Sequence, residues 1–263
     1  MTSAGHPPPA DCTDILGVHV SAINLEDAIT TIQRWIVEGS QKYVCVTGVH
    51  GVMESKRNQR LRSIHNEAGM VTPDGMPLVW LSRLRGRRRT KRVYGPDLMR
   101  KMTAVSELHG YRQFYYGGAE DIAERLKLTL TAAHPRLQVA GTFCPPFRDL
   151  MPEEDQAVVD TINAARPHIV WVGLSTPKQE FWMGSHLGRI EAPVMIGVGA
   201  AFDFLAGTKR QAPFWMQRSG LEWLFRLSTE PRRLWRRYAY IVPTFAILAV
   251  GELAGRILNG SET

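Results

Sequence analysis

Short runs of β-branched and aromatic residues alternate along this chain with longer amphipathic stretches, and no other feature limits its possible folds as strongly. Strands that alternate with helices build a parallel sheet with helices wound around it. We therefore predict an α/β fold with a mainly parallel, Rossmann-like sheet. The predicted strands cover residues 43–47, 113–116, 138–142, 169–172 and 194–198, and the predicted helices cover residues 52–68, 96–108, 119–133, 152–165 and 177–187.

The chain changes character at Pro213. From there the sequence is rich in Trp, Leu and Arg and has nearly continuous helical periodicity, with a break at Pro231. We predict a disordered leader over residues 1–13, which lacks the basic and apolar regions of a secretion signal. An α/β domain should follow over residues 14–212, and a C-terminal helical appendage over residues 213–263.

The helix predicted after Pro231 has two chemically different faces, a pattern typical of helices that lie in a membrane interface. Its apolar stretch over residues 241–250 is interrupted by Pro243. We expect this stretch to be too short to span a bilayer, because a span needs about 20 apolar residues. One face carries Arg232, Arg233, Arg236 and Arg237, and the opposite face carries Leu234, Trp235, Tyr238, Ile241 and Val242.

Composition narrows the class of partner. The net charge of +7 is concentrated in two basic runs, residues 83–92 and 226–237. A polyanion or an anionic surface should bind there, and charge alone does not separate nucleic acid from acidic lipid. The three cysteines lie far apart without a C-x-x-C pair, so we expect neither a disulfide framework nor a thiolate metal cluster. A reducing cytoplasm fits this pattern best.

Unusual residues follow the predicted strands, where ligands of parallel sheets bind. Asp74 stands between Pro73 and Gly75, a setting that either points a carboxylate into the cleft or forms an ordinary turn. Gly117 and Gly118 could let a diphosphate approach the next helix, or could simply connect strand and helix.

Two more loops carry polar candidates. Lys178 and Gln179 begin a helix after a Pro, which suits either a substrate contact or ordinary helix capping. Asp203, which lies between two phenylalanines, could accept hydrogen bonds from a ribose or a base, or could be a buried structural carboxylate. The sequence alone does not separate a functional from a structural role at either loop.

Several common site types are absent from the sequence. There is no H-E-x-x-H or D-x-D-like metal site and no G-x-S-x-G nucleophile elbow. Gly197 and Gly199 begin a dinucleotide fingerprint, but Phe202 stands where the third glycine belongs. We therefore expect no metal and no cofactor.

Taken together, these motifs make the chain similar to a known family. The matching segments are residues 72–80, 92–99, 173–180, 197–204 and 213–237, and the resemblance runs from about Asp14 to the arginine-rich tail. The chain resembles the TagA/WecG/CpsF family of bacterial glycosyltransferases, glycosyltransferase family 26. The amino-acid sequence around Asp74 is most similar to that of family members that act in exopolysaccharide assembly.

The resemblance implies an inverting, metal-independent transfer of a sugar from a UDP donor to a saccharide on a polyprenyl-diphosphate carrier. The sugar would be of the N-acetylmannosamine type, a uronic acid or a hexose. Asp74 matches the family's catalytic base, Thr47, Arg92 and Gln179 match its pocket residues, and Asp203 matches a nucleotide contact. The family often has Asn two residues after the Thr, where this chain has Val49, and His50 is a candidate replacement.

The leaving diphosphate needs cations when no metal is present, and arginine binds phosphate oxygens in bidentate fashion. Arg92 and the appendage residues Arg218, Arg226 and Arg233 are the candidates. We expect the protein to be cytoplasmic, peripheral on the inner face of the cell membrane, and able to form homo-oligomers. Two alternatives stay open, a basic nucleic-acid-binding α/β protein and a non-catalytic membrane-surface scaffold.

Overall fold

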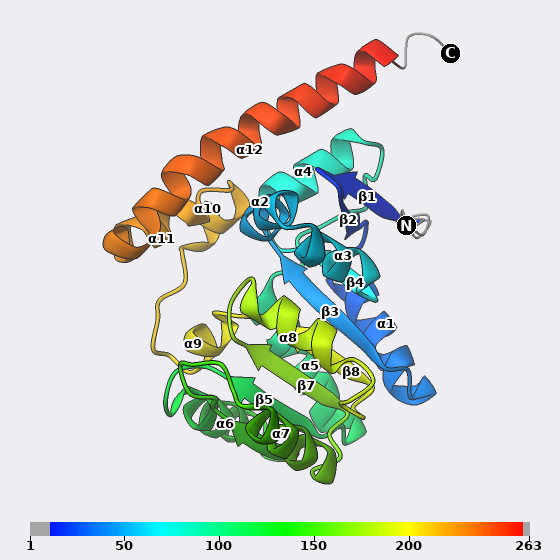
Figure 1. The fold of residues 1–263 in the computed structure, drawn as a ribbon, viewed down its shortest axis with the longest axis vertical. Helices are drawn as coiled ribbons and strands as arrows, with labels where there is room; N and C mark the ends of the chain where they lie inside the picture. Colours follow the sequence, from blue (N-terminus) through cyan, green and yellow to red (C-terminus); the bar gives the residue numbers. More distant parts are fainter. Residues whose placement is uncertain (1–10, 260–263) are drawn as a thin grey trace.

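A six-stranded sheet in which all paired strands are parallel forms the centre of the molecule (Figure 1). The computed structural model describes residues 11–259. The strand order is β4-β3-β8-β7-β5-β6, which confirms the predicted α/β fold with a parallel sheet. The strands are β3 (Lys42–Thr47), β4 (Met70–Pro73), β5 (Gln113–Gly117), β6 (Val139–Phe143), β7 (Ile169–Gly173) and β8 (Val194–Gly197).

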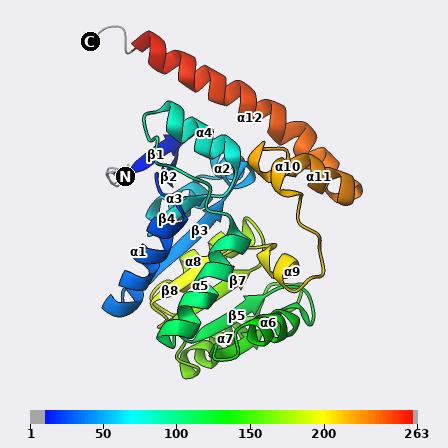
Figure 2. The ribbon, with the colours of Figure 1, turned by 180° about the vertical axis from the view of Figure 1, so that it is seen from behind.

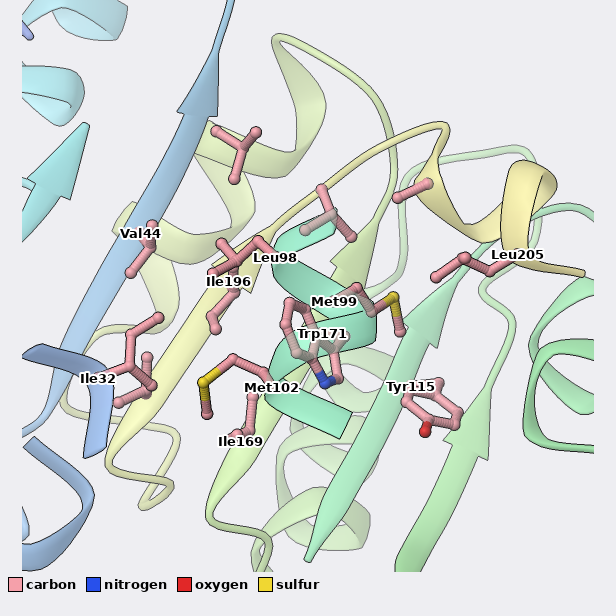
Figure 3. Packing of buried hydrophobic residues seen from close by; sticks show 14 of the residues in the cluster. Ile32, Val44, Leu98, Met99, Met102, Tyr115, Ile169, Trp171, Ile196 and Leu205 are labelled. Atoms are coloured by element: carbon pink, nitrogen blue, oxygen red, sulfur yellow. The ribbon is translucent and has the colours of Figure 1, made fainter. Parts of the chain in front are cut away.

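The central strands of this sheet are buried on both sides, because helices cover both faces. On one face Tyr115, Trp171 and Ile196 pack against α5, as Figure 3 shows. On the other face Tyr116 stacks on Trp182, with ring centroids 4.2 Å apart. The first face is covered by α1 (Leu25–Glu38), α5 (Gly95–His109), α6 (Ile122–Ala133) and α9 (Ala201–Leu205), and the second by α2 (Val49–Arg57), α3 (Gln59–Glu67), α7 (Pro152–Ala164) and α8 (Lys178–His186).

An antiparallel hairpin of β1 (Cys12–Ile15) and β2 (Val18–Ser21) precedes the sheet and was not among the predicted strands. It begins two residues before the predicted start of the domain at residue 14. Ile15, Val18 and Val20 are fully buried, so the hairpin belongs to the folded body. The first ten residues of the predicted leader lie outside the described residues.

The long helix predicted over residues 52–68 is two helices, α2 and α3, that meet at Asn58. Asn58 has an extended backbone and ends α2. Its side-chain Oδ1 accepts a hydrogen bond from the N–H of Leu61 at 3.1 Å, which caps α3.

The appendage consists of three helices, α10 (Phe214–Arg218), α11 (Glu222–Thr229) and α12 (Pro231–Asn259), rather than one nearly continuous helix. A non-helical segment over residues 206–213 leads from α9 to α10 (Figure 2). Pro231 begins α12 at the predicted break, because Pro is well tolerated in the first turn of a helix.

Helix α12 crosses α2 and lies alongside the N-terminal body (Figure 1). One stripe of it, with Leu234, Ile241, Phe245 and Ala249, is buried against the body. Trp235, which the helical wheel placed with Leu234, is instead 53% exposed. Successive residues point about 100° apart around a helix, so Trp235 turns away from the narrow buried stripe.

The helix also continues through Pro243, so it is longer than the sequence suggested. Within the described residues, α12 is the one helix long and apolar enough to cross a membrane by length and composition, because an 18-residue stretch of residues 231–255 has a mean hydropathy of 1.4. We predicted that this segment is too short to span a bilayer because Pro243 interrupts it. The helix continues through Pro243 and is long enough, so that prediction is wrong. The buried stripe and the ion pair between Glu252 and Arg85, at 2.8 Å, show that α12 docks on the body.

A crevice opens where the connections leave the sheet in opposite directions. After β3 the chain passes to α2 on one face, whereas after the neighbouring β8 it passes to α9 on the other. Ligands of open parallel sheets bind at such points, beyond the carboxyl ends of the strands. The fold therefore directs attention to the loops after β3, β4, β7 and β8.

Candidate active site

The largest group of sequence-predicted residues meets in one cleft at this crevice. Its floor is formed by the loops after the strands, and α11 and α12 of the appendage close it from the other side. The two segments of the chain are therefore both needed to enclose it. The cleft is lined chiefly by Gly48, His50, Asp74, Tyr94, Ser175, Gln179, Gly199, Asp203, Lys209, Glu222, Arg226, Arg233 and Arg237.

Asp74 lies just after β4 at the bottom of the cleft. Its backbone N–H donates a hydrogen bond to the carbonyl oxygen of Thr47, at 3.0 Å, which joins the ends of β3 and β4. Its carboxylate Oδ1 lies 3.5 Å from Nη2 of Arg92. Asp74 is thus more than a turn residue, because its side chain faces the cleft while its main chain extends the sheet.

The environment of Asp74 disfavours its charged form. Burial raises the pKa of Asp74 to about 6, and the nearby carboxylate of Glu222 acts in the same direction. Arg92 and Arg226 oppose this rise by stabilising the anion. A carboxylate with a pKa near neutrality is well suited to take a proton and release it again.

Arg92 joins the body to the appendage. Its Nη2 lies 2.5 Å from a carboxylate oxygen of Glu222 on α11, and its Nη1 donates to Gln217 at 3.2 Å. Its Nε donates to the carbonyl oxygen of Asp74, and its guanidinium lies 4.0 Å from the ring centroid of Tyr94. Burial opposes the charge, but Asp74 and Glu222 raise the pKa of Arg92. The structure thus engages Arg92 with protein carboxylates and does not place it on the cleft lining.

Thr47 does not reach the cleft with its side chain. Its Oγ1 is buried and lies 3.0 Å from Nε2 of His65, whose Nδ1 lies 3.0 Å from Oγ of Ser55. Burial lowers the pKa of His65 to about 4, so the ring is neutral in this network. Thr47 contributes to the site through its carbonyl, which holds the N–H of Asp74.

Gln179 and Lys178, neighbours in the sequence, have different surroundings. Gln179 is buried on the cleft wall, its Nε2 donates to Glu180 at 3.1 Å, and its Oε1 has no partner among the described residues. That oxygen is buried at the cleft wall and lacks a hydrogen-bond donor among the described residues. Lys178 is exposed and does not line the cleft.

Gly117 and Gly118 have a structural reason to be glycine. Both have positive φ, and a Cβ at Gly117 would lie 2.9 Å from the backbone of Gly173 on the adjacent strand. The N–H of Gly118 donates to the carbonyl of Gly173 at 3.0 Å. Neither glycine lines the cleft, and the exposed acids Glu120 and Asp121 precede α6. This geometry favours the close approach of two strands over the phosphate-binding interpretation.

Asp203 lines the cleft and belongs to a chain of ion pairs that the sequence did not predict. Lys209 Nζ lies 3.6 Å from Asp203 and 3.9 Å from Glu230. Glu230 also holds Arg233, at 2.5 Å. Asp203 is therefore partly accessible and connected to the appendage.

The predicted arginines of the appendage divide into three groups. Arg226, Arg233 and Arg237 line the cleft. Arg236 lines an adjoining hollow together with Arg237. Arg218 and Arg232 are exposed and line neither space.

Glu222, Tyr94 and Lys209 were missed as site residues. Tyr94 and Glu222 lie within segments that resembled the family, which was the available signal for them, whereas Lys209 lies between two of those segments. Their roles depend on which residues from distant segments face them. Across residues 11–259, no cluster of three or more His, Cys, Asp or Glu side chains is arranged to hold a metal ion.

The sequence of the whole chain agrees with this arrangement. Residues 13–258 match the family described as the glycosyl transferase WecG/TagA/CpsF family. The chain belongs to this family. The resemblance inferred from the motifs is therefore confirmed, and the cleft is the candidate active site of a sugar-transferring enzyme.

Relatives within the WecG/TagA/CpsF family include bacterial enzymes named N-acetylglucosaminyldiphosphoundecaprenol N-acetyl-beta-D-mannosaminyltransferase. The one from Bacillus spizizenii is 30% identical over 184 residues, which cover 70% of this chain and 69% of the relative. The one from Bacillus subtilis is 30% identical over 187 residues, 71% of this chain and 70% of the relative. The one from Staphylococcus aureus is 25% identical over 225 residues, 85% of this chain and 87% of the relative.

Proposed function

We propose that the protein transfers a sugar from a UDP donor to a saccharide carried on a polyprenyl diphosphate, with inversion and without a metal ion. The observation that carries this proposal is the meeting of Asp74, a partly buried carboxylate with a raised pKa, with three arginines of the appendage in one cleft. The relatives' names describe transfer of N-acetylmannosamine to such a lipid-linked acceptor. This similarity supports the choice of donor sugar class and acceptor.

In the proposed reaction Asp74 is the general base. An acceptor hydroxyl attacks the anomeric carbon of the donor from the face opposite the nucleotide, and its proton passes to the carboxylate of Asp74. The new bond joins the acceptor oxygen to the anomeric carbon, while the bond from that carbon to the diphosphate oxygen breaks. Attack from the opposite face inverts the configuration. A base of this kind contributes typically 10²–10⁴-fold to a rate.

The leaving diphosphate gains negative charge as that bond breaks, and cations must stabilise it. Arg226 and Arg233 line the same cleft as Asp74 and come from the appendage. Arginine stays charged and can bind two phosphate oxygens at once. We assign the donor diphosphate to this pair, and we assign Asp203 and Gln179 to hydrogen bonds with the nucleotide or the donor sugar.

A peripheral position on the inner face of the cell membrane fits the outer side of α12. Ile247 and Val250 are 72% and 64% exposed on the side away from the buried stripe. The exposed residues Arg232 and Arg236 lie towards the N-terminal end of the same helix. An apolar face next to a basic end matches the interface of an anionic membrane. The docked stripe favours a helix that lies on the membrane over one that crosses it.

The proposal extends to a role in exopolysaccharide assembly, for which the donor sugar could also be a uronic acid or a hexose. The sequence around Asp74 supports this role. Self-association stays a prediction, which sedimentation of the purified protein would check.

Transfer from a panel of UDP-sugars to a polyprenyl-diphosphate saccharide, in liposomes with EDTA present, tests the proposal. We expect transfer by the wild type and a loss of most turnover in Asp74→Asn. If no pair reacts, UDP binding separates a missing substrate from a non-catalytic scaffold. Binding of oligonucleotides with steep salt dependence and no binding of UDP would instead favour the nucleic-acid alternative.

A further inference from the structure

A second hollow adjoins the catalytic cleft. It lies between α2, the loop before α8 and the first half of α12, and it shares His50, Thr176 and Arg237 with the cleft. We call it the arginine hollow. Its full lining is His50, Glu54, Arg57, Thr176, Pro177, Arg236, Arg237, Tyr240 and Ile241.

Cations dominate the arginine hollow, and two of them lie over aromatic rings. The guanidinium of Arg57 lies 4.0 Å from the ring centroid of Tyr240, and that of Arg236 lies 5.3 Å from the ring centroid of Trp235. Stacking holds a guanidinium plane while its edge stays free to donate hydrogen bonds. Three arginines face one carboxylate, Glu54, in the lining.

The single negative charge of Glu54 does not neutralise the three arginines of the arginine hollow. The carboxylate of Glu54 lies 3.6 Å from Nε2 of His50. Burial lowers the pKa of His50 to about 4, and the positive charges of Arg237 and Arg226 act in the same direction. His50 is therefore neutral at neutral pH, and the hollow retains an excess of positive charge that suits a polyanionic group.

Both substrates of the proposed reaction carry a diphosphate, so the site must bind two of them. Arg226 and Arg233 line the same cleft as the base, and the donor diphosphate must lie in this cleft because its bond breaks there. Arg57 and Arg236 lie outside the cleft, in the arginine hollow. From this hollow the surface continues along α12 towards the exposed apolar residues Ile247 and Val250.

Resting on the proposed function, we propose that the arginine hollow binds the diphosphate of the lipid-linked acceptor through Arg57, Arg236 and Arg237. The acceptor sugar then passes His50 to reach Asp74 in the cleft, and the lipid chain leaves along the outer side of α12. The two diphosphates occupy separate sets of arginines, which lets both substrates bind at once.

Arg57→Gln tests this assignment, because Arg57 lies on α2 and belongs to the arginine hollow alone. The acceptor saccharide is compared in two forms, one linked to a polyprenyl diphosphate and one linked to a neutral alkyl group. A hydrogen bond to a charged group is worth enough that its loss should raise KM for the diphosphate acceptor about tenfold or more. KM for the UDP-sugar and turnover of the alkyl acceptor should not change.

Arg60→Gln is the matched control. Arg60 also stacks on an aromatic ring, 5.6 Å from the centroid of Phe181, but it lines neither the cleft nor the arginine hollow. Its variant should behave like the wild type with both acceptors. An equal loss on both acceptors in Arg57→Gln, or a raised KM for the UDP-sugar, would overturn the assignment.

A binding measurement separates this assignment from the proposed activity. Farnesyl diphosphate should bind to the protein saturated with UDP, and Arg57→Gln should weaken that binding whether or not transfer is observed. A lack of transfer by the wild type counts against the proposed function alone. Unchanged farnesyl diphosphate binding in Arg57→Gln counts against the arginine hollow.

A third arm distinguishes the acceptor from ordinary anionic lipid. Vesicles that contain phosphatidylglycerol and no acceptor should bind wild type and Arg57→Gln equally in a flotation assay. A loss of vesicle binding as large as the loss of acceptor affinity would identify a headgroup site and overturn the acceptor assignment.

Discussion

The pKa of the proposed base depends on its charged neighbours. Asp74 lies close to Arg92, and Arg92 also pairs with Glu222. A carboxylate beside an arginine ordinarily has a low pKa. Here burial outweighs Arg92, and Glu222 shares the guanidinium, so that the pKa of Asp74 lies near 6. The raised pKa makes Asp74 a stronger general base, which can take the proton of a hydroxyl group as that group attacks.

Replacement of that base gives the first prediction. Asp74→Asn keeps the size of the side chain but removes the group that accepts the proton, so kcat should fall by about 10²–10⁴-fold. The fold and UDP binding should persist, which circular dichroism and calorimetry with UDP would check. Transfer close to the wild-type rate would remove Asp74 from the role of base.

The pH dependence of transfer gives the second prediction. Asp74 must be ionised to act as a base, so kcat/KM should fall as the pH decreases through about 6. The carboxylate of Glu222 raises the pKa of Asp74, so Glu222→Gln should move this limb of the profile to lower pH. Glu38→Gln, at a surface pair with Arg34, is the control and should leave the profile unchanged. A limb in the same place in all three proteins would contradict the coupling.

The buried ring of His65 gives a third prediction, on stability. Its pKa is about 4 in the folded protein and about 6.5 when unfolded, so the unfolded chain binds the proton first as the pH falls. The stability that its neutral form contributes is present above pH 6.5 and is lost as the pH falls towards 4. At pH 5 this loss is about 2 kcal/mol.

Urea unfolding of wild type and His65→Gln at pH 7 and pH 5 measures this effect. The wild type should lose about 2 kcal/mol more than the variant between the two pH values. Other titrating groups are common to both proteins and cancel in the comparison. An equal pH dependence in both proteins would show that His65 does not titrate in this way.

At the scale of whole elements, the sequence predicted the interior more accurately than the edges. The strands β3, β5, β7 and β8 are apolar runs that cannot be exposed, and they were predicted to within a residue of their bounds. The hairpin of β1 and β2 and the break at Asn58 were missed. Their signals are one short alternating segment and one capping side chain, which a longer helical period obscured.

The docking of α12 gives a fourth prediction. Arg85 at the end of α4 (Met76–Leu84) is only 7% exposed in its side chain, and Glu252 lies 2.8 Å from it. Removing one partner of a fully buried ion pair costs about 3–5 kcal/mol, and Glu252 is partly exposed, so Glu252→Gln should weaken docking by no more than about 3 kcal/mol. Trypsin should then cut at the arginines of α12 more rapidly.

The double variant Arg85→Met with Glu252→Gln is the control, because it removes the buried charge as well. It should recover part of the protection against trypsin. If the single variant is as resistant as the wild type, the ion pair does not hold α12 on the body.

At the scale of the whole molecule, the outer side of α12 determines how the protein meets a membrane, and it gives a fifth prediction. Ile247→Lys with Val250→Lys places two charges on this exposed apolar surface, so binding to anionic vesicles should fall about tenfold or more. UDP binding should stay unchanged. Leu128→Lys on α6, at a residue that is also 66% exposed, is the control. Equal flotation of all variants would contradict membrane contact through this face.

The sequence alone determined the fold class, the family and the identity of the residues near the strand ends. These follow from local signals, namely apolar periodicity and ordered motifs. Asp74, Gln179 and Asp203 were found in this way, and the structure brings all three to one cleft.

Only the tertiary structure decided which way each side chain faces and what lies opposite it. Thr47 hydrogen-bonds to His65, and Arg92 forms an ion pair with Glu222. Gly117 allows β5 to lie close to β7. The arginine hollow arises because α12 returns to lie across α2, about 180 residues earlier in the chain. Contacts between segments so far apart depend on how the whole chain packs, and a pattern that extends over a few residues carries no information about them.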